Sequence, residues 1–189
     1  HIGTNAGLCI FDGNSLKIYP STDNGISDII YTTFQDKNGT IWVATETGIK
    51  VFTGTQLTDT LVHTPLNLIA IYNIHQDEDG TMWFCPIRNG LFKYKNNKIE
   101  ACSLYEPLES ELNFVAKVNK INDTTHWVCD RKGLYELTPN SSRRIDSIAD
   151  VNIRNVGFYD FIQTSNHELI LSGNNGSIYI IKEGEKTLE

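Results

Sequence analysis

The sequence lacks the features that mark membrane-spanning and nucleic-acid-binding proteins. No apolar run approaches the roughly 18 residues that a bilayer-crossing helix needs. With 16 Lys and Arg against 23 Asp and Glu, the net charge is −7, so no basic surface is present to release counterions from a nucleic-acid backbone. The same charge disfavours binding to an anionic membrane. Since no charged-then-apolar leader occurs in the 189 residues, we expect any export signal to lie outside them.

Cysteine is scarce and follows no metal-binding pattern. The four cysteines, at positions 9, 85, 102 and 129, form no C-x-x-C pair. We expect buried free thiols, and an oxidising compartment leaves disulfides open. No two of the five histidines stand two or four residues apart, and neither a Gly-x-Ser-x-Gly elbow nor a P-loop occurs. We therefore predict no metal, no cofactor and no catalytic residue.

Two acidic stretches allow other interpretations. The segment 77–80 resembles part of a calcium loop, but it is one Asp short of the EF-hand alternation and lacks the closing bidentate Glu. Glu106, Glu109 and Glu111 could provide the two carboxylates of a glycosidase. We expect the first stretch to be a turn and the second to be a solvated connection.

A repeat of about 42 residues runs through the chain. Five glycines are separated by 41, 42, 43 and 43 residues: Gly7, Gly48, Gly90, Gly133 and Gly176. The positions of Trp42, Trp83 and Trp127 are separated by 41 and 44 residues, with His1 and Ile170 as the outer equivalents. Each repeat has a β-branched and aromatic run and then a turn such as 36–40 or 77–81. We expect Asn-Gly and Asp-Gly to form tight hairpins, since both residues tolerate positive φ.

Four antiparallel strands in about 42 residues are typical of one propeller blade. We therefore predict an all-β fold, a partial β-propeller of about four and a half four-stranded blades. The expected blades are about 1–20, 25–64, 66–105, 111–148 and 153–187, the first without an opening strand, and 188–189 is interpreted as a cloning scar. We predict that the three Trp side chains pack between blades and that the five repeated glycines are structural.

The repeat resembles a known family. Residues 34–45 read Phe-Gln-Asp-Lys-Asn-Gly-Thr-Ile-Trp-Val-Ala-Thr and are followed by Gly-Ile-Lys-Val-Phe at 48–52; this is similar to the two-component-regulator propeller repeat, as is 75–83 with 89–91. The last two copies depart from the pattern, without the turn glycine. In that family such repeats build the periplasmic, sugar-responsive region of hybrid sensor histidine kinases. The resemblance implies a non-catalytic extracytoplasmic segment for ligand sensing and signal transduction.

Candidate ligand-binding residues follow from the repeat itself. Residues between the second and third strands vary, because the scaffold does not dictate them, and they share one face of a propeller with the connections between blades. This gives Asn5, Glu46, Arg88, Asn89, Arg131, Lys132, Asn174 and Asn175, with His63, Tyr105 and Glu106 on the connections. Arg88 and Arg131 could bind a sugar carboxylate or sulfate through both guanidinium nitrogens.

The expected partners are an oligosaccharide, the rest of the parent sensor and a second copy of the chain. Open blade faces exceed the apolar area that soluble monomers normally expose, so we predict self-association. Three alternatives stay open at this point: a relay without ligand contact, a protein-interaction propeller, and a propeller lyase or hydrolase.

Overall fold

The computed structural model describes residues 1–23, 26–103, 115–148, 151–164 and 168–181. These residues form strands and turns only, and the predicted all-β partial propeller is confirmed. No helix among them is long and apolar enough to cross a membrane. The chain divides into two compact units, His1–Ala101 and Cys102–Glu189.

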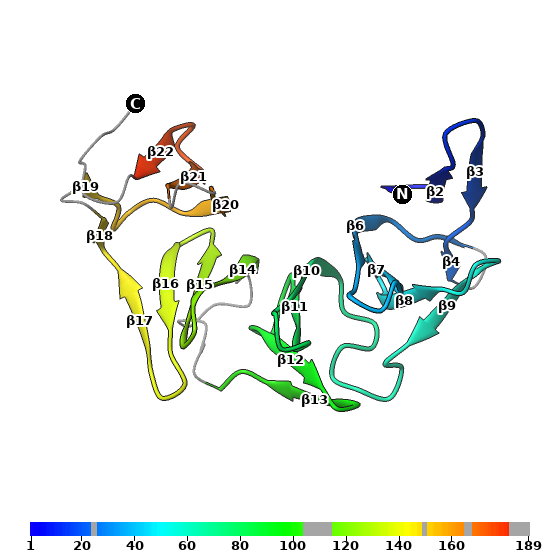
Figure 1. Ribbon diagram of the computed structural model, residues 1–189, viewed down its shortest axis with the longest axis horizontal. Coiled ribbons are helices and arrows are strands. Elements are labelled where there is room, and N and C mark those ends of the chain that lie inside the picture. Colours follow the sequence, from blue (N-terminus) through cyan, green and yellow to red (C-terminus); the bar gives the residue numbers. More distant parts are fainter. Residues whose placement is uncertain (24–25, 104–114, 149–150, 165–167, 182–189) are drawn as a thin grey trace. The chain divides into compact units, whose positions relative to one another are not determined.

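The first unit contains three blades of antiparallel strands (Figure 1). Each blade is a meander whose strands pair in chain order, and β6 lies against both β1 and β10. Blade 1 is β1 (Ile2–Thr4), β2 (Gly7–Phe11) and β3 (Leu16–Tyr19). A short ladder of β4 (Thr22–Asp23) and β5 (Ile26–Ser27) follows it. Blade 2 is β6 (Ile30–Gln35), β7 (Ile41–Thr45), β8 (Gly48–Phe52) and β9 (Leu57–Thr60); blade 3 is β10 (Ile71–Gln76), β11 (Met82–Pro86), β12 (Phe92–Lys95) and β13 (Lys98–Ala101).

The second unit repeats this arrangement. Blade 4 is β14 (Val115–Asn122), β15 (Thr125–Asp130), β16 (Gly133–Leu137) and β17 (Ser142–Ile145). The pair β18 (Ser147–Ile148) and β19 (Val151–Asn152) leads to blade 5, which is β20 (Phe158–Gln163), β21 (Leu169–Gly173) and β22 (Ile178–Ile181).

The turn between the first two strands of blades 2 and 3 has one geometry. Gly39 N–H donates to the Asp36 carbonyl at 2.9 Å and Asp36 N–H to the Thr40 carbonyl at 2.9 Å; 77–81 repeats both bonds at 3.1 and 2.9 Å. Only the glycine takes a positive φ, +84° in both turns. Of the two residues in Asn-Gly and Asp-Gly that tolerate positive φ, only the glycine adopts it. The turn is a three-residue loop with a glycine bulge rather than a two-residue hairpin.

The turn aspartate also fixes the repeated tryptophan. Trp42 Nε1 donates to Asp36 Oδ2 at 2.9 Å, and Trp83 Nε1 donates to Asp77 Oδ2 at 2.8 Å. Both indoles are buried. The Trp42 ring packs on blade 3, with centroids 5.9 Å from those of Phe84 and Tyr94. One carboxylate thus satisfies the indole N–H that burial would otherwise leave without a partner.

Blade 4 keeps the tryptophan without this carboxylate. Ile121 stands six residues before Trp127, where blades 2 and 3 carry Asp36 and Asp77. Trp127 is half-buried and its ring lies 6.4 Å from that of Phe161 in blade 5. The packing of a repeated Trp against the next blade is therefore found in both units.

The remaining turns explain some of the repeated glycines. Gly7 and Gly48 have φ of +135°, and Gly90 and Gly176 have φ of +83°, whereas Gly133 lies outside this region. The closest approach involves a glycine outside the repeat pattern, Gly157, where an added Cβ would lie 1.9 Å from the Arg131 carbonyl oxygen. Blades 4 and 5 could not meet there with a larger residue. Cys9, Cys85 and Cys129 are buried, Cys102 is partly buried, and none of these four described cysteines forms a disulfide.

Candidate functional site

A buried charge cluster lies within blade 2. Lys50 on β8 has its ammonium 2.5 Å from Asp59 Oδ1 on β9 and 3.5 Å from Asp28 Oδ2, which precedes β6. The side chain of Asp28 is 0% exposed, that of Lys50 6% and that of Asp59 62%. Thr47 completes the cluster: its hydroxyl donates to Asp28 Oδ2 at 2.7 Å and its N–H to Oδ1 at 3.2 Å. Every charge in the cluster is therefore compensated by a partner.

Blades 1, 3 and 4 have no such charge pair at these positions. The strand registers place Lys50 opposite Asp59, and the corresponding cross-strand pairs are Cys9 with Ile18, Phe92 with Ala101, and Tyr135 with Arg144. Taking a charged group out of water costs several kcal/mol unless it is well paired. Since an apolar residue fills the site in blades 1 and 3, the fold does not require the ion pair.

A hollow of about 170 Å³ opens beside this cluster. Its walls come from the β7–β8 turn, strand β9 and the β9–β10 connection, and they are Thr47, Gly48, Ile49, Asp59, Thr60, Val62, Asn67 and Leu68. Polar groups of Asp59 and Asn67 stand beside the apolar side chains of Val62 and Leu68, both of which are exposed. The hollow is smaller than the roughly 300–1,000 Å³ of a drug-sized pocket, so it fits one small unit of a ligand.

The wall formed by the β9–β10 connection is strained. Leu68 has φ of +58° and Leu61 φ of +57°, in a region that leucine rarely adopts. Leu68 N–H donates to the Thr47 carbonyl at 3.1 Å, which ties this wall to the β7–β8 turn. Backbone strain of this kind costs of order 1–3 kcal/mol per residue and concentrates at functional sites.

Carboxylates of blade 2 also affect the pKa of a tyrosine on strand β6. Burial raises the pKa of Tyr31, and the carboxylates of Glu46 and Asp28 raise it further. The Tyr31 ring lies 6.2 Å from that of Tyr72 on β10. Tyr31 on β6 and Tyr72 on β10 therefore lie close together, near the carboxylates of Asp28 and Glu46.

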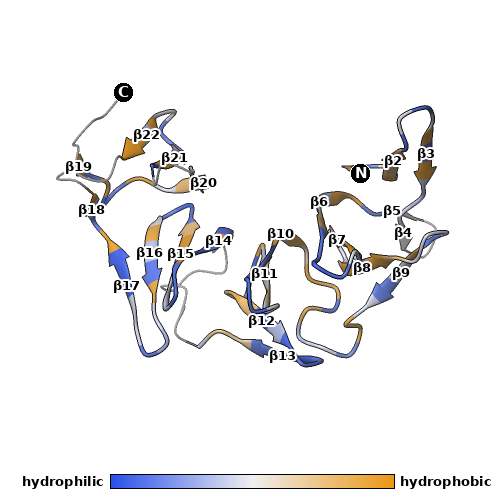
Figure 2. Ribbon diagram, in the orientation of Figure 1, coloured by the Kyte–Doolittle hydropathy of each residue, from blue (hydrophilic) through white to orange (hydrophobic). Residues whose placement is uncertain are grey.

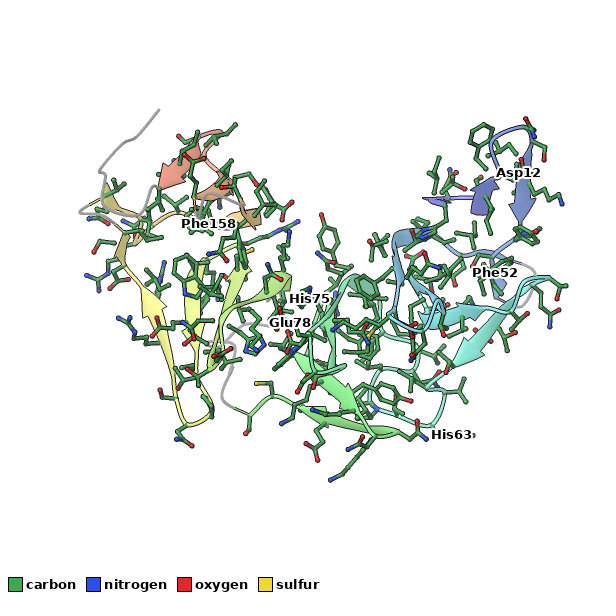
Figure 3. The ribbon with its side chains drawn as sticks, viewed as in Figure 1. Asp12, Phe52, His63, His75, Glu78 and Phe158 are labelled. Carbon is green, nitrogen blue, oxygen red and sulfur yellow. The ribbon has the colours of Figure 1, made fainter. Side chains whose placement is uncertain are left out.

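The sequence-predicted residues of the first unit stand at the expected turns, and two of them adjoin walls of the hollow. Glu46 is exposed beside Thr47, with its N–H donating to the Ile29 carbonyl at 3.0 Å. His63 is exposed on the β9–β10 connection that forms a wall of the hollow, well apart from His75 on β10 (Figure 3). Asn5, Arg88 and Asn89 are exposed on the corresponding turns of blades 1 and 3, and Asn89 has φ of +70°.

In the second unit, two predicted residues have partners within the protein, and one of them, Asn174, links blades 4 and 5. Asn174 Nδ2 donates to the Arg131 carbonyl at 3.3 Å, while its Oδ1 accepts from Gly157 N–H at 3.2 Å. Asn175 Nδ2 donates to the Tyr179 hydroxyl at 3.0 Å. The side chains of Arg131 and Lys132 are exposed, whereas Tyr105 and Glu106 lie outside the described residues. The two amides therefore have structural partners.

Sequence reasoning missed Asp28, Lys50, Asp59 and Asn67. Lys50 could have been found by aligning the repeats, because a lysine replaces the apolar residue that blades 1 and 3 have between two buried positions. Asp28 and Asn67 lie in connections that share no pattern between repeats. No sequence pattern therefore predicts that Asp28 and Asn67 both lie near the β7–β8 turn.

Titration and metal-binding geometry give no reaction centre. Burial is the main cause that raises the pKa of Tyr135 to about 12, with a contribution from the Asp130 carboxylate. Across the described ranges, no three His, Cys, Asp or Glu side chains are grouped as metal ligands. The arrangement of blade 2 is suited to hydrogen bonding a polar ligand, not to nucleophilic attack.

The repeated antiparallel sheets, stacked within each unit, define the chain as a segment of a β-propeller. Residues 24–47 match the family model described as the two component regulator propeller. The resemblance read from the sequence is confirmed, and the chain carries a two-component regulator propeller repeat. The matched residues include Asp28, Trp42 and Thr47. No curated protein matches the chain in sequence.

Solved structures with the same fold include sensor and enzyme propellers. Two structures of the extracellular domain of BT4673 from B. thetaiotaomicron, described as a one component and as a hybrid two component system, are 16% and 17% identical with TM-scores of 0.64 and 0.57. Each match covers 99% of this chain and 31% or 30% of that domain. Virginiamycin B lyase from Staphylococcus aureus is 13% identical with a TM-score of 0.62, over 94% of this chain and 62% of the lyase. The chain thus spans less than a third of the BT4673 domain, and these identities establish the fold alone.

Proposed function

We propose that this chain is a non-catalytic, periplasmic sensor segment of a two-component system, in which the hollow of blade 2 binds one unit of a carbohydrate. The observation that carries the proposal is the Asp28–Lys50–Asp59 cluster, in which Asp28 and Lys50 are buried and Asp59 is exposed, beside a hollow in the blade that matches the family repeat. The BT4673 propellers, which are extracellular domains, support the location and the signalling role.

The walls of the hollow suit a sugar ring. Asp59 and Asn67 provide hydrogen-bonding groups for hydroxyls, while Val62 and Leu68 offer apolar surface to ring C–H groups. Lys50 holds Asp59 in one orientation, and Thr47 joins the hollow wall to the buried Asp28. A preorganised site of this kind avoids the cost of ordering side chains on binding.

Titration calorimetry with a panel of neutral and sulfated oligosaccharides tests the proposal. Asp59→Asn and Asn67→Ala should each weaken binding of the positive oligosaccharide by about tenfold, the effect of roughly one lost hydrogen bond to a charged or buried group. Asp123→Asn is the matched control, because Asp123 is fully exposed in the second unit. Unchanged affinity of both hollow variants would place the ligand elsewhere and favour the relay alternative.

Arg88 and Arg131 extend the proposal to acidic sugars. Each guanidinium stands on an exposed turn between second and third strands and can pair with a carboxylate or sulfate. Arg88→Gln or Arg131→Gln should then weaken sulfated ligands and leave neutral ones unchanged. Mass spectrometry of the same panel after incubation with the chain tests the lyase or hydrolase alternative, which requires new products.

A further inference from the structure

The large exposed apolar side chains of the first blade gather on one face. Ile2, Phe11, Leu16 and Ile18, which we call the blade 1 face, are 58%, 60%, 56% and 58% exposed. The registers Ile2 with Cys9, Cys9 with Ile18 and Phe11 with Leu16 put all four on the same side of the sheet. Figure 2 shows β2 in the colour of hydrophobic residues. Single exposed apolar residues need no explanation, but four on one face do.

The equivalent residues of blade 2 indicate which kind of surface this face can contact. Ile2, Phe11 and Leu16 have the same sheet positions as Val43, Phe52 and Leu57 of blade 2. In blade 2 those three residues pack on blade 1, in a cluster with Leu8, Ile10 and Tyr19. The Phe52 ring lies 4.6 Å from that of Tyr19, and Tyr94 of blade 3 makes the same kind of contact with Trp42. The blade 1 face is therefore equivalent to the surface of blade 2 that packs on blade 1 in the seam between these two blades.

The other half of such a seam is exposed on blade 5. Ile162, Ile170, Ile178 and Ile180, which we call the blade 5 face, correspond by register to Phe34, Trp42, Ile49 and Val51. In blade 2 those four residues pack toward blade 3. In blade 5, Ile162 is 48% and Ile178 55% exposed, and β22 appears hydrophobic in Figure 2. One chain thus presents both complementary halves.

We propose that the blade 5 face of one chain docks on the blade 1 face of a second copy, so that the chain associates head to tail. Each contact reproduces the seam that blades 1 and 2 make within the chain, with four isoleucines in place of Leu8, Ile10 and Tyr19. This is a heterologous contact, since the two surfaces are different patches. A dimer joined by one contact keeps one free face of each kind, so association continues past the dimer unless the assembly closes on itself.

Sedimentation velocity over a wide concentration range gives the first test. The sedimentation coefficient of the natural chain should rise with concentration, whereas Phe11→Asp and Ile178→Asp should each remain monomeric. A carboxylate buried in an apolar seam weakens association by at least about a hundredfold, since no partner compensates it. Ile29→Asp is the control, because Ile29 is an apolar residue that is 39% exposed and lies outside both faces and outside the hollow. It should associate as the natural chain does.

Mixing the two variants distinguishes head-to-tail docking from a symmetric contact. Phe11→Asp keeps an intact blade 5 face and Ile178→Asp an intact blade 1 face, so an equimolar mixture should form a 1:1 dimer that grows no further. A symmetric contact between two blade 1 faces would let Ile178→Asp associate by itself and would overturn the proposal. A natural chain that stays monomeric at every concentration would overturn it as well.

Folding of the variants is checked independently. Far-UV circular dichroism and thermal unfolding should match those of the natural chain, because both substituted side chains are more than half exposed. If either aspartate variant unfolds, Leu16→Asn and Ile162→Asn replace the pair and carry the same expected outcomes. Association that persists in all four variants would contradict the assignment of the two faces.

Discussion

Blades 2 and 3 are neighbours with the same turn and the same tryptophan, yet their interiors differ in one respect. Asp36 and Asp77 each hold an indole, and both loops close with a glycine at φ +84°. Blade 2 then places Lys50 where blade 3 has Phe92. In both blades the turn and the tryptophan serve the packing of one blade on the next, while the lysine is a departure that this packing does not explain.

The difference extends to the partners of that position. Asp28 and Asp59 in blade 2 correspond to Ile69 and Ala101 in blade 3, so an apolar trio replaces an ionic one. The hollow lies beside the ionic trio. In a repeat protein the copies can therefore be compared with one another. Residues that the copies share indicate what folding needs, and an energetically unfavourable residue found in one copy, such as Lys50, indicates a candidate functional position.

The strongest test of the comparison removes one charge from blade 2. Lys50→Met leaves Asp28 buried without a counter-ion, and breaking a buried pair in this way costs about 3–5 kcal/mol of unfolding free energy. Urea denaturation followed by tryptophan fluorescence measures the loss. Lys93→Met in blade 3 is the matched control, since Lys93 and its partner Glu100 are both about half exposed and should lose less than about 1 kcal/mol. Equal losses in the two variants would contradict the view of Lys50 as a buried, paired charge.

The second test converts blade 2 into blade 3. The triple variant Asp28→Ile, Lys50→Phe, Asp59→Ala removes all three charges at once, so no unpaired charge remains. The Thr47 hydroxyl and N–H lose Asp28 as acceptor but keep their contacts with Thr45 Oγ1. Replacing a buried ionic group by apolar residues is often neutral or stabilising by about 1–4 kcal/mol. We therefore expect equal or higher stability together with loss of carbohydrate binding. A triple variant as unstable as Lys50→Met would mean that the fold itself depends on the ion pair.

The sequence predicts what the blades share and misses what distinguishes them. Trp42, Gly48 and the turn at 36–40 recur, and recurrence identified both the fold and the packing of Trp42 between blades. Asp28 and Asn67 do not recur, because each lies in a connection whose path depends on the packing of two blades. The seam at Gly157 was missed for the same reason, since only three-dimensional contact reveals the Arg131 carbonyl oxygen against it.

Among the predicted site residues, sequence reasoning found positions but not roles. Asn174 was expected to vary freely for ligand binding, and its amide bridges Gly157 and Arg131 instead. Variation between repeats does not separate a ligand contact from a local solution to blade packing. Glu46 and His63 adjoin the walls of the hollow, while the residues that carry its chemistry came only from the structure.

The third test concerns the shared turn. Asp36→Ala removes the acceptor of the Trp42 indole and of the Asn38 and Thr40 amides, bonds of 2.9 Å each. A buried donor left without a partner costs about 1–3 kcal/mol. Asp123→Ala in blade 4 is the control, because that carboxylate is fully exposed and should change stability by less than about 0.5 kcal/mol. A blue shift of the Trp42 fluorescence without any change in stability would argue against this role of Asp36.

The smallest expected effect concerns Asp79 of blade 3, whose equivalent in the turn of blade 2 is Asn38. The hydrogen bond from the Lys95 ammonium, followed by that from the Thr81 amide, lowers the pKa of Asp79 to about 2. Because the pKa is lower in the folded than in the unfolded state, this group stabilises the fold above about pH 4, and the contribution disappears as the pH falls toward 2. Both side chains are about half exposed, so solvent screening limits the effect to less than about 1 kcal/mol.

Asp79→Asn should therefore be slightly less stable than the natural chain at pH 7, with the difference disappearing between about pH 4 and pH 2 and shrinking in 1 M NaCl, where the Debye length is about 3 Å. Urea denaturation at stepped pH measures it. Asn38→Asp is the reciprocal variant, and it should gain no such pH dependence, because blade 2 has Thr53 where blade 3 has Lys95. A pH-dependent gain in Asn38→Asp equal to the loss in Asp79→Asn would show that the turn amides alone lower the pKa, and the lysine would then have no part in it.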